Sequence, residues 1–389
     1  MIDGYDLSRD LGAINRALAE DMPEAAIFYC GRALEATSAR AVAALNLDPG
    51  TQVFANLDTL ERLSCISRPA LTLGHALRRL SNDARHILRP LSRHDADFAA
   101  LCLGPWLQWY MEDYFRGPRA KPGDESFGLA SPLASGTVAD VLALLRAAQI
   151  SGEDVSDKLL ALCDAHVARL PALAAMIAET LISCGKAQAA QSVLDAALAA
   201  VPDDLRLRQL HALGRRRAGY PEEAIELLKG LSARYSEDEE TLGITAGALK
   251  SCWEHGHGPA DALAQAQRLY RKGWQVSRAH NLYLGVNAAA IQLWQSDAAG
   301  ASDLAQRIAA NFSERNAQLA KSGIDVAMQR DYYDMVTEAE ARLLAGEGGA
   351  SRALYADAFR RFAARKGDIE GSREQADRSI VLLGGAPIG

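Results

Sequence analysis

A spacing of 34 residues in the second half of the chain constrains the fold more than any other feature of the sequence. Ala190 and Ala224 are 34 positions apart, and so are Ala178 and Ala212, each of which stands twelve residues earlier. A glycine turn separates the two alanines of each unit. Small residues on both sides of a turn, repeated at a fixed interval, indicate pairs of closely crossing helices. Such pairs bury their apolar faces only against their neighbours, so the sequence predicts a stack of antiparallel helix pairs.

The same interval recurs further along the chain. Ala289 and Ala301 repeat the twelve-residue offset, although their distance from Ala224 requires one longer repeat in between, and a degenerate unit follows at 331–365. The period and the small residues resemble those of tetratricopeptide repeats. We therefore expect stacked pairs over about residues 150–365, with Ala190 and Ala224 in equivalent buried positions. The alternative is an irregular, alanine-rich helical bundle.

Composition extends the helical prediction to the whole chain. Of the 389 residues, 49% are hydrophobic but only 6% aromatic, and alanine and leucine dominate the apolar set, which favours helix over sheet. Prolines and glycines are concentrated at 116–136, where no helix can persist. The predicted architecture is all-α: a helical bundle at 1–115, a linker at 116–136, and a tetratricopeptide-like α-solenoid at 137–389. Within the bundle we expect helices at 11–19, 23–45, 56–63, 69–89 and 95–115.

Charge and cysteine content exclude several functional classes. A net charge of −7 argues against a protein that coats nucleic acid or an anionic membrane. Acidic residues stand where a secretory signal would carry cations, and no apolar run is long enough to span a bilayer, so we expect a cytoplasmic protein without membrane contact. The six cysteines form no C-x-x-C pair and are predicted to be reduced thiols. No motif for a metal, nucleotide or other cofactor is present, and we predict none.

Residues 240–294 carry a narrower pattern. The strings ETLGITAGALKSCW, LYRKGW and NLYLGVNAAAI, followed by DYYDMVTEAEARLLAG, resemble the bacterial branch of the TRAFs-binding domain, over about residues 150–365. The matching positions are Glu240, Thr241, Gly243, Lys250, Trp253, Tyr270, Gly273, Trp274, Tyr283, Gly285, Asn287 and Ala288.

The resemblance implies an interaction or scaffold module that takes a protein partner, and a place in bacterial anti-phage or other conflict systems. We expect Trp274 and Tyr283 to be mainly packing residues, because aromatic residues at helical spacing usually belong to a core. Asn287 is expected to face the binding groove. Lys250 and Asn287 are the candidate partner-binding residues of the repeats.

The N-terminal region, about residues 10–115, resembles small HEPN-like helical domains. Their signature is an A-A-x-x-x-x-R-x-x-L-E helix followed by R-x-x-G-N-x-x-x-H. This chain has AAIFYCGRALE, with Arg32 and Glu35, and LRRLSNDARH, with Asn82 and His86. Ser81 stands where the family has glycine.

The helix expected at 69–89 is the segment best suited to chemistry. Arg79, Asn82 and His86 fall within an arc of about 60° on a helical wheel. The same polar face carries Arg78, Arg85 and Arg89, and the opposite side is apolar.

The spacing of Arg79 and His86 also fits the R-x4–6-H pattern of HEPN ribonucleases. An imidazole can move the proton of a ribose 2′-hydroxyl, and a guanidinium can stabilise the charge of the transition state, without a metal. In that family the site is completed across a two-fold dimer. Arg79, Asn82 and His86 are therefore the candidate catalytic residues, and Arg78, Arg85 and Arg89 are candidate binding residues.

The competing hypothesis is structural. Asn82 and His86 would then fasten the helix to the one bearing Arg32 and Glu35, and His86→Ala would cost about 1–3 kcal/mol. We therefore predict a non-enzymatic adaptor or regulatory subunit that binds a protein partner on its repeats, with candidate RNA contact at 78–89 and a candidate homodimer through the bundle. The alternative is a metal-independent HEPN-type ribonuclease regulated by its repeats.

Overall fold

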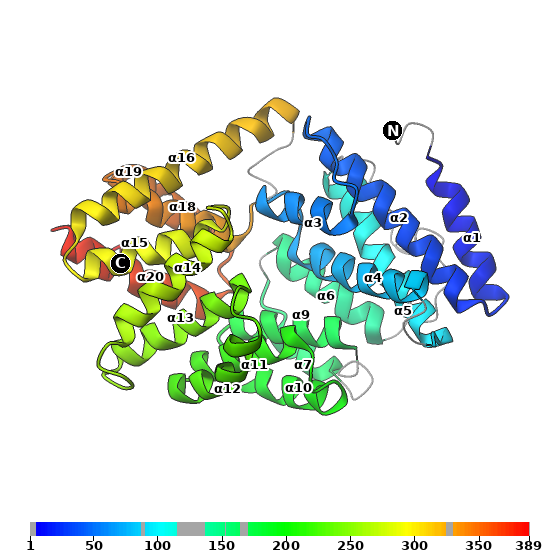
Figure 1. Cartoon of the computed structure of the whole chain (residues 1–389), viewed down its shortest axis with the longest axis horizontal. Helices are drawn as coiled ribbons and strands as arrows, with labels where there is room; N and C mark the ends of the chain where they lie inside the picture. The colour runs from blue at the N-terminus through cyan, green and yellow to red at the C-terminus, as the bar shows by residue number, and fades with distance from the viewer. Residues whose placement is uncertain are drawn as a thin grey trace. The chain divides into compact units, whose positions relative to one another are not determined.

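The computed structural model describes residues 5–86, 90–114, 137–151, 153–163, 170–323 and 330–388. Throughout these ranges the regular structure is helical, without a strand, which confirms the predicted all-α class (Figure 1). None of the helices in these ranges is long and apolar enough to cross a membrane. The predicted linker at 116–136 lies outside the described residues, so its position stays a prediction.

Internal contacts divide the chain into two compact units. Unit 1 consists of Met1–Ala143 with Arg315–Arg330, and unit 2 consists of Leu144–Glu314 with Asp331–Gly389. The sequence did not predict that a late segment would belong to unit 1. This segment includes the end of α16 (Ala298–Ser322), where the side-chain amide of Gln318 donates to the carbonyl oxygen of Leu45 at 2.7 Å. That bond satisfies a carbonyl at the end of a unit 1 helix, which would otherwise lack an intrahelical partner.

Unit 1 contains the five helices that the sequence predicted, with ends shifted by a few residues. The first helix begins four residues early because the Asp6 carboxylate accepts hydrogen bonds from two backbone amides of the first turn. The last helix contains Pro105, which has no backbone N–H to donate and so interrupts the hydrogen bonds along the helix. Beyond this proline the chain continues into a short π-helix. The bounds are α1 Leu7–Ala19, α2 Pro23–Ala44, α3 Val53–Arg62, α4 Arg68–His86, α5 Arg93–Gln108 and η1 Trp109–Tyr114, with α6 Thr137–Ser151 following.

Helix α2 is the central element of unit 1 and packs against α1, α3, α4 and α5. Its length carries buried alanine, leucine and isoleucine side chains. The fully buried indole of Trp106 in α5 donates to the Thr37 hydroxyl of α2 at 2.8 Å. The Tyr114 hydroxyl donates to the Ala41 carbonyl oxygen at 2.7 Å. These two buried bonds fix α5 and η1 against α2.

Helices α2 and α4 cross at a point where only one side chain fits. A Cβ atom built on Gly31 of α2 would lie 1.9 Å from Ser81 Oγ and 2.6 Å from Ser81 Cβ of α4. Ser81 is itself buried. The close approach of α2 and α4 therefore depends on the absence of a side chain at Gly31.

Unit 2 is a succession of antiparallel helix pairs. In the chain order each helix from α9 to α15 packs on the next, as do α18 and α19. The bounds are α7 Ser156–Leu162, α9 Pro171–Ser183, α10 Ala187–Ala200, α11 Leu205–Arg217, α12 Pro221–Arg234, α13 Glu239–Glu254, α14 Ala262–Val276, α15 Leu282–Trp294, α18 Tyr332–Leu344, α19 Gly348–Arg361 and α20 Lys366–Leu382. The first helices of the pairs are α9, α11, α13, α15 and α18.

The predicted repeat register is confirmed. Ala190 and Ala224 are each the fourth residue of a second helix, α10 and α12, and neither is exposed to solvent. Ala178 and Ala212 are equally buried in the first helices. The longer repeat arises in α13, which has 16 residues against 13 in α11, and in the loop that follows it.

Candidate functional site

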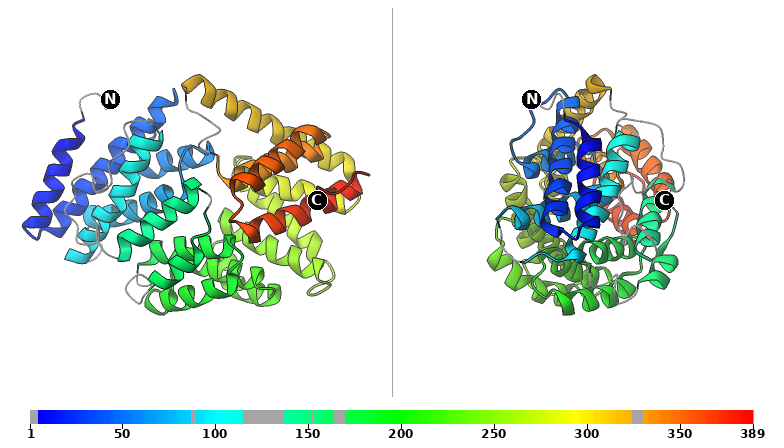
Figure 2. Two further views of the ribbon diagram at one scale, coloured as in Figure 1. Left: turned by 180° about the vertical axis from the view of Figure 1, so that it is seen from behind. Right: turned by 90° about the vertical axis from the view of Figure 1, so that its right-hand side faces the viewer.

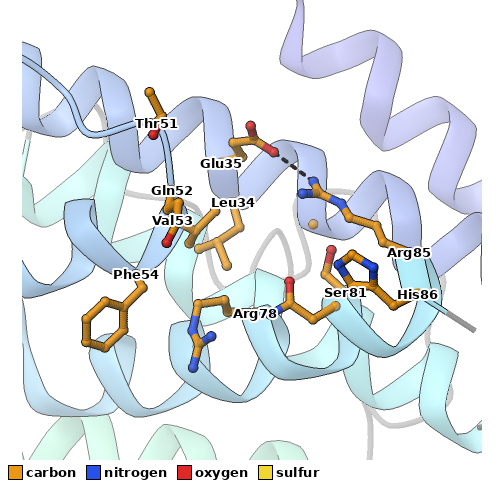
Figure 3. Close-up of a pocket in the computed structure, with 12 residues that line it drawn as sticks. Leu34, Glu35, Thr51, Gln52, Val53, Phe54, Arg78, Ser81, Arg85 and His86 are labelled. Atoms are coloured by element: carbon orange, nitrogen blue, oxygen red, sulfur yellow. Dashed lines mark hydrogen bonds and ion pairs between the residues drawn. The ribbon is translucent and has the colours of Figure 1, made fainter. Parts of the chain in front are cut away.

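A pocket of about 270 Å³ lies in unit 1 between α2, α4 and the start of α3 (Figure 3). Its lining residues are Gly31, Leu34, Glu35, Thr51, Gln52, Val53, Phe54, Arg78, Ser81, Asn82, Arg85 and His86.

Helix α4 supplies the polar wall of this pocket. Arg85 Nη2 donates to Glu35 Oε2 at 2.7 Å, which Figure 3 shows as the ion pair joining α4 to α2. The guanidinium of Arg78 stacks over the Phe54 ring at 5.6 Å, and its Nε atom is buried without a hydrogen-bond partner among the described residues. Since Glu35 is the single carboxylate among the described lining residues, the side chains give the pocket a positive balance.

The opposite wall is the N-terminus of α3. The side chain of Asn56 holds the preceding loop in place, because it accepts from Gly50 N at 2.8 Å and donates to Gly50 O at 3.3 Å. Gln52 is the N-cap residue, and its side chain makes no capping hydrogen bond. The first amides of α3 therefore lack a side-chain acceptor at the cap, and a helix N-terminus carries a partial positive charge that favours anions.

A neighbouring histidine reports the positive field around α4. The pKa of His75 is lowered to about 4 by burial and by the charges of Arg78, Arg79 and Arg68. The pKa of Arg78 is lowered for the same two reasons, burial and the charge of Arg79. An anion in the pocket would relieve this repulsion between cations.

The structure brings together only part of the set predicted on this helix. Arg78, Asn82, Arg85 and His86 line the pocket, and neither Asn82 nor His86 is hydrogen-bonded through its side chain to any other described residue. Arg79 is exposed and does not line it.

The predicted partnership of Arg79 with His86 stays a prediction, because only His86 of the two lines this pocket. Arg79 lies at the edge of the polar face that is farthest from Arg78 and Arg85, which line the pocket together with His86. Arg89 lies outside the described residues.

The helix partners proposed for His86 are engaged elsewhere. Glu35 pairs with Arg85, and Arg32 pairs with Asp10 of α1 at 3.4 Å. The α3 wall of the pocket was missed in the sequence, where the only signal is a turn followed by a helix start.

The repeat region of unit 2 holds a second polar site, on the side where the first helices of the pairs meet α20. In both views α20, drawn in red, lies between the green and the yellow-to-orange helices of this unit (Figures 1 and 2). The side-chain amide of Gln375 is at its centre. Gln375 Nε2 donates to both carboxylate oxygens of Glu340 in α18, at 2.8 and 2.7 Å, and to Asn287 Oδ1 in α15 at 3.3 Å. Its Oε1 accepts from Lys250 Nζ in α13.

Asp368, near the start of α20, is the centre of a buried ionic cluster. Its carboxylate accepts from Arg217 Nη2 of α11 at 3.2 Å, from the Tyr333 hydroxyl of α18 at 2.6 Å, and from Arg365 Nε at 2.9 Å. Arg365 also donates to the Ser183 hydroxyl of α9 at 3.2 Å.

Near the other end of α20, two tryptophans form an aromatic clamp. The rings of Trp253 in α13 and Trp294 in α15 stack with centroids 5.9 Å apart. The guanidinium of Arg378 lies 4.9 Å from each ring. The Trp294 indole donates to the Ser379 hydroxyl at 3.1 Å.

Burial and pairing oppose each other in these clusters. Burial raises the pKa of Glu340 to about 7, against the opposing charge of Lys250 and the bond from Gln375. Burial also lowers the pKa of Lys250. For Asp368, burial alone would raise the pKa, but Arg365 and Arg217 outweigh it and hold the value below its usual range. The charges of this face therefore depend on the contacts with α20.

The residues of the pattern at 240–294 divide into packing residues and residues that contact α20. Leu284 of α15 packs where Cβ atoms on Gly243 and Gly273 would lie 3.0 and 2.5 Å from it. Trp274 is buried, as expected, and covers Gly285 in the same way. These glycines let three successive helices approach closely.

Tyr283 is more exposed than expected for a packing residue, whereas Asn287 is covered. Tyr283 is 38% exposed, although its ring meets those of Tyr270 and Tyr333 edge-on. Asn287 is only 2% exposed, because its amide donates to the Tyr283 carbonyl at 2.9 Å and its oxygen accepts from Gln375. Asn287 therefore lies on the side of the repeats that α20 covers.

Comparison with known proteins identifies the repeats. Residues 186–292 match the family model described as Tetratricopeptide Repeats-Sensor. No curated protein matches the chain.

Several solved structures resemble the chain at low identity. A thermophilic TPR protein of Thermus thermophilus, TTC0263, is 16% identical over 54% of this chain and 97% of that one, with a TM-score of 0.38. The human IFIT1 dimer with m7Gppp-AAAA is 12% identical over 98% of this chain and 96% of that one, with a TM-score of 0.40. A Rap protein complexed with competence and sporulation factor is 13% identical over 97% of this chain and 98% of that one, with a TM-score of 0.38. The helix pairs and the family match together show that residues 186–292 are a tetratricopeptide repeat region.

Proposed function

We propose that this protein is an adaptor or regulatory subunit whose repeats hold a helical segment of a protein partner. One observation carries the proposal. All five first helices of the pairs, α9, α11, α13, α15 and α18, contribute side-chain contacts to α20 or to its N-cap residue Arg365. The face is thus shaped and charged to hold a helix through hydrogen bonds and ion pairs. Helix-in-groove binding is a common mode of peptide recognition.

The biological setting is a further part of the proposal. The resemblance of residues 240–294 to bacterial TRAFs-binding domains supports a role in an anti-phage or other conflict system. A cytoplasmic location is part of the same proposal. The repeat match supports the interaction role itself.

Site-specific crosslinking tests the proposed partner surface. A photo-crosslinking amino acid is placed at Tyr283, which is 38% exposed and lies beside the Asp368 cluster. It is expected to capture a discrete protein in cells. The matched control is Leu227 in α12, a second helix of a pair, which is 37% exposed. Equal adducts from both positions, or adducts to RNA alone, would contradict binding of a protein on this face.

A second candidate function is RNA contact at the pocket of unit 1. The observation that favours it is the meeting of Arg78, Arg85 and His86 with the N-terminus of α3, opposite one carboxylate. This arrangement suits a phosphate group. In its catalytic form His86 would move the ribose proton and Arg78, in place of Arg79, would stabilise the phosphate charge.

Paired arginine variants test this second function. Arg78→Ala is expected to weaken binding of a single-stranded RNA about tenfold, because it removes a cation from the pocket. Arg79→Ala removes the same charge from the same helix outside the pocket, and should change binding much less. His86→Ala should alter the unfolding free energy by less than about 0.5 kcal/mol, because the imidazole is exposed and makes no hydrogen bond to the described residues. Metal-free RNA cleavage that is lost in a folded His86→Ala protein would establish the ribonuclease; equal losses from both arginine variants would exclude a specific pocket.

A further inference from the structure

We infer that α20 is an internal occupant of the repeat groove, which a partner's helix replaces on binding. The inference rests on the proposed function and adds the chemistry of the partner. That partner is a helix that presents a carboxylate and, seven residues later, a side-chain amide on one face.

The spacing of the contacting residues defines this pattern. Asp368, Gln375 and Ser379 are separated by seven and four residues, so they lie on one side of the helix. Each bonds to a different part of the groove: Asp368 to Arg217, Gln375 to Lys250 and Glu340, and Ser379 to Trp294. The groove therefore recognises a sequence of polar groups along one helix face.

Polar residues make up half of the buried residues of α20. Its buried residues are Asp368, Ala376, Ser379 and Ile380, of which two are apolar. The other helices of the repeats bury apolar faces, as α15 does with leucine, isoleucine, valine and alanine. Apolar burial is the largest contribution to holding helices together, whereas hydrogen bonds exchange against water at small net gain. Helix α20 adds only Ala376 and the partly buried Ile369 to the apolar cluster around Tyr332 and Tyr355, so its departure removes few apolar contacts from the core.

The groove also selects what can replace α20. Without an occupant, Arg217 loses Asp368, and Lys250 and Glu340 lose Gln375. Water can solvate these groups in an empty groove, but an apolar helix would keep them buried without partners, which is costly, so it is a poor substitute. A helix with the same polar pattern restores each contact. This is the physical basis for selectivity among partners.

The start of α20 is a point at which the helix can be displaced by a small change. A Cβ atom on Gly367 would lie 2.9 Å from Gly185 Cα and 2.9 Å from the Ile182 carbonyl oxygen, both of them backbone atoms. Gly367→Ala therefore pushes the start of α20 away from the end of α9 and its following turn, while every polar side chain of α20 is kept. Gln375→Ala opens the groove by the opposite means, since it removes the central amide. Glu374→Ala, at the exposed neighbouring position, is the matched control.

Hydrogen exchange on the full chain measures the first consequence. In Gly367→Ala and in Gln375→Ala, the amides of α20 are expected to exchange at least tenfold faster than in the unmodified protein, while α13 and α15 keep their rates. Glu374→Ala should leave α20 unchanged. Faster exchange throughout α9–α19 in both opening variants would show that α20 is an integral part of the fold, and would overturn the inference.

Binding in trans measures the second consequence. A labelled peptide of residues 366–385 should bind the Gly367→Ala/Gln375→Ala protein at least tenfold more tightly than the unmodified protein, where the tethered α20 competes at high effective concentration. The same peptide carrying Gln375→Ala should bind at least tenfold more weakly, and one carrying Glu374→Ala equally well. Absence of peptide binding to the opened protein would overturn the inference. The Tyr283 crosslink is independent of this assay: a captured partner without peptide binding would leave the proposed function intact, and peptide binding without a partner would refute only that function.

Discussion

Gly31→Ala is expected to lower the free energy of unfolding of unit 1 by about 3 kcal/mol. The added methyl group would lie 1.9 Å from Ser81 Oγ and 2.6 Å from Ser81 Cβ. A change of rotamer moves the hydroxyl but not the Cβ atom, so α2 and α4 must separate. Both helices belong to the core around α2, and the strain spreads to its other neighbours. Urea unfolding of the full chain, followed by hydrogen exchange of the α2 and α4 amides, measures the loss.

The facing residue provides a matched control. Ser81→Gly alone should cost about 0.5–1 kcal/mol, through the lower helix propensity of glycine. Combined with Gly31→Ala it removes the clashing side chain, so the double variant should recover most of the lost stability. If the two losses simply add, the close crossing of α2 and α4 is refuted.

Ala224→Leu is expected to destabilise the repeats of unit 2 by about 3 kcal/mol. Ala224 is fully buried and packs in a core with Ala212, Leu228, Ile244 and Ala248 of three successive helices. Three further carbon atoms cannot enter this close contact without moving one helix pair off the next. Thermal and urea unfolding monitored by circular dichroism measure the effect.

The repeat itself supplies matched positions for this test. Ala190→Leu, one period earlier, should cost a similar amount because Ala190 is equally buried. Ala233→Leu and Ala199→Leu make the same change at exposed positions that are also one period apart, and should shift stability by less than about 0.5 kcal/mol. Equal costs at buried and exposed positions would refute the register.

The candidate site in unit 1 was only half predictable. The polar face of α4 could be read from helical periodicity, which is a local property, and Arg78, Asn82, Arg85 and His86 do share the pocket. Which edge of that face opens to the pocket depends on how α3 and α2 pack against α4. Arg79, on the other edge of that face, does not line the pocket.

The sequence by itself determined the helices and the repeat register. Both follow from interactions between residues a few positions apart, namely capping, helix propensity and the interval at which a small residue must face a neighbouring helix. Ala190 and Ala224 are buried for that reason.

Only the tertiary structure decided which contacts the polar and charged residues of the repeats make. Gln375 meets Lys250, Glu340 and Asn287 from positions 125, 35 and 88 residues away. Nothing in the local sequence links these positions, since a polar residue on a helix face is equally suited to solvent or to a distant partner. The return of α20 along the first helices of the pairs makes the choice, because burial there leaves each charge dependent on a group of opposite charge or matching hydrogen-bonding capacity.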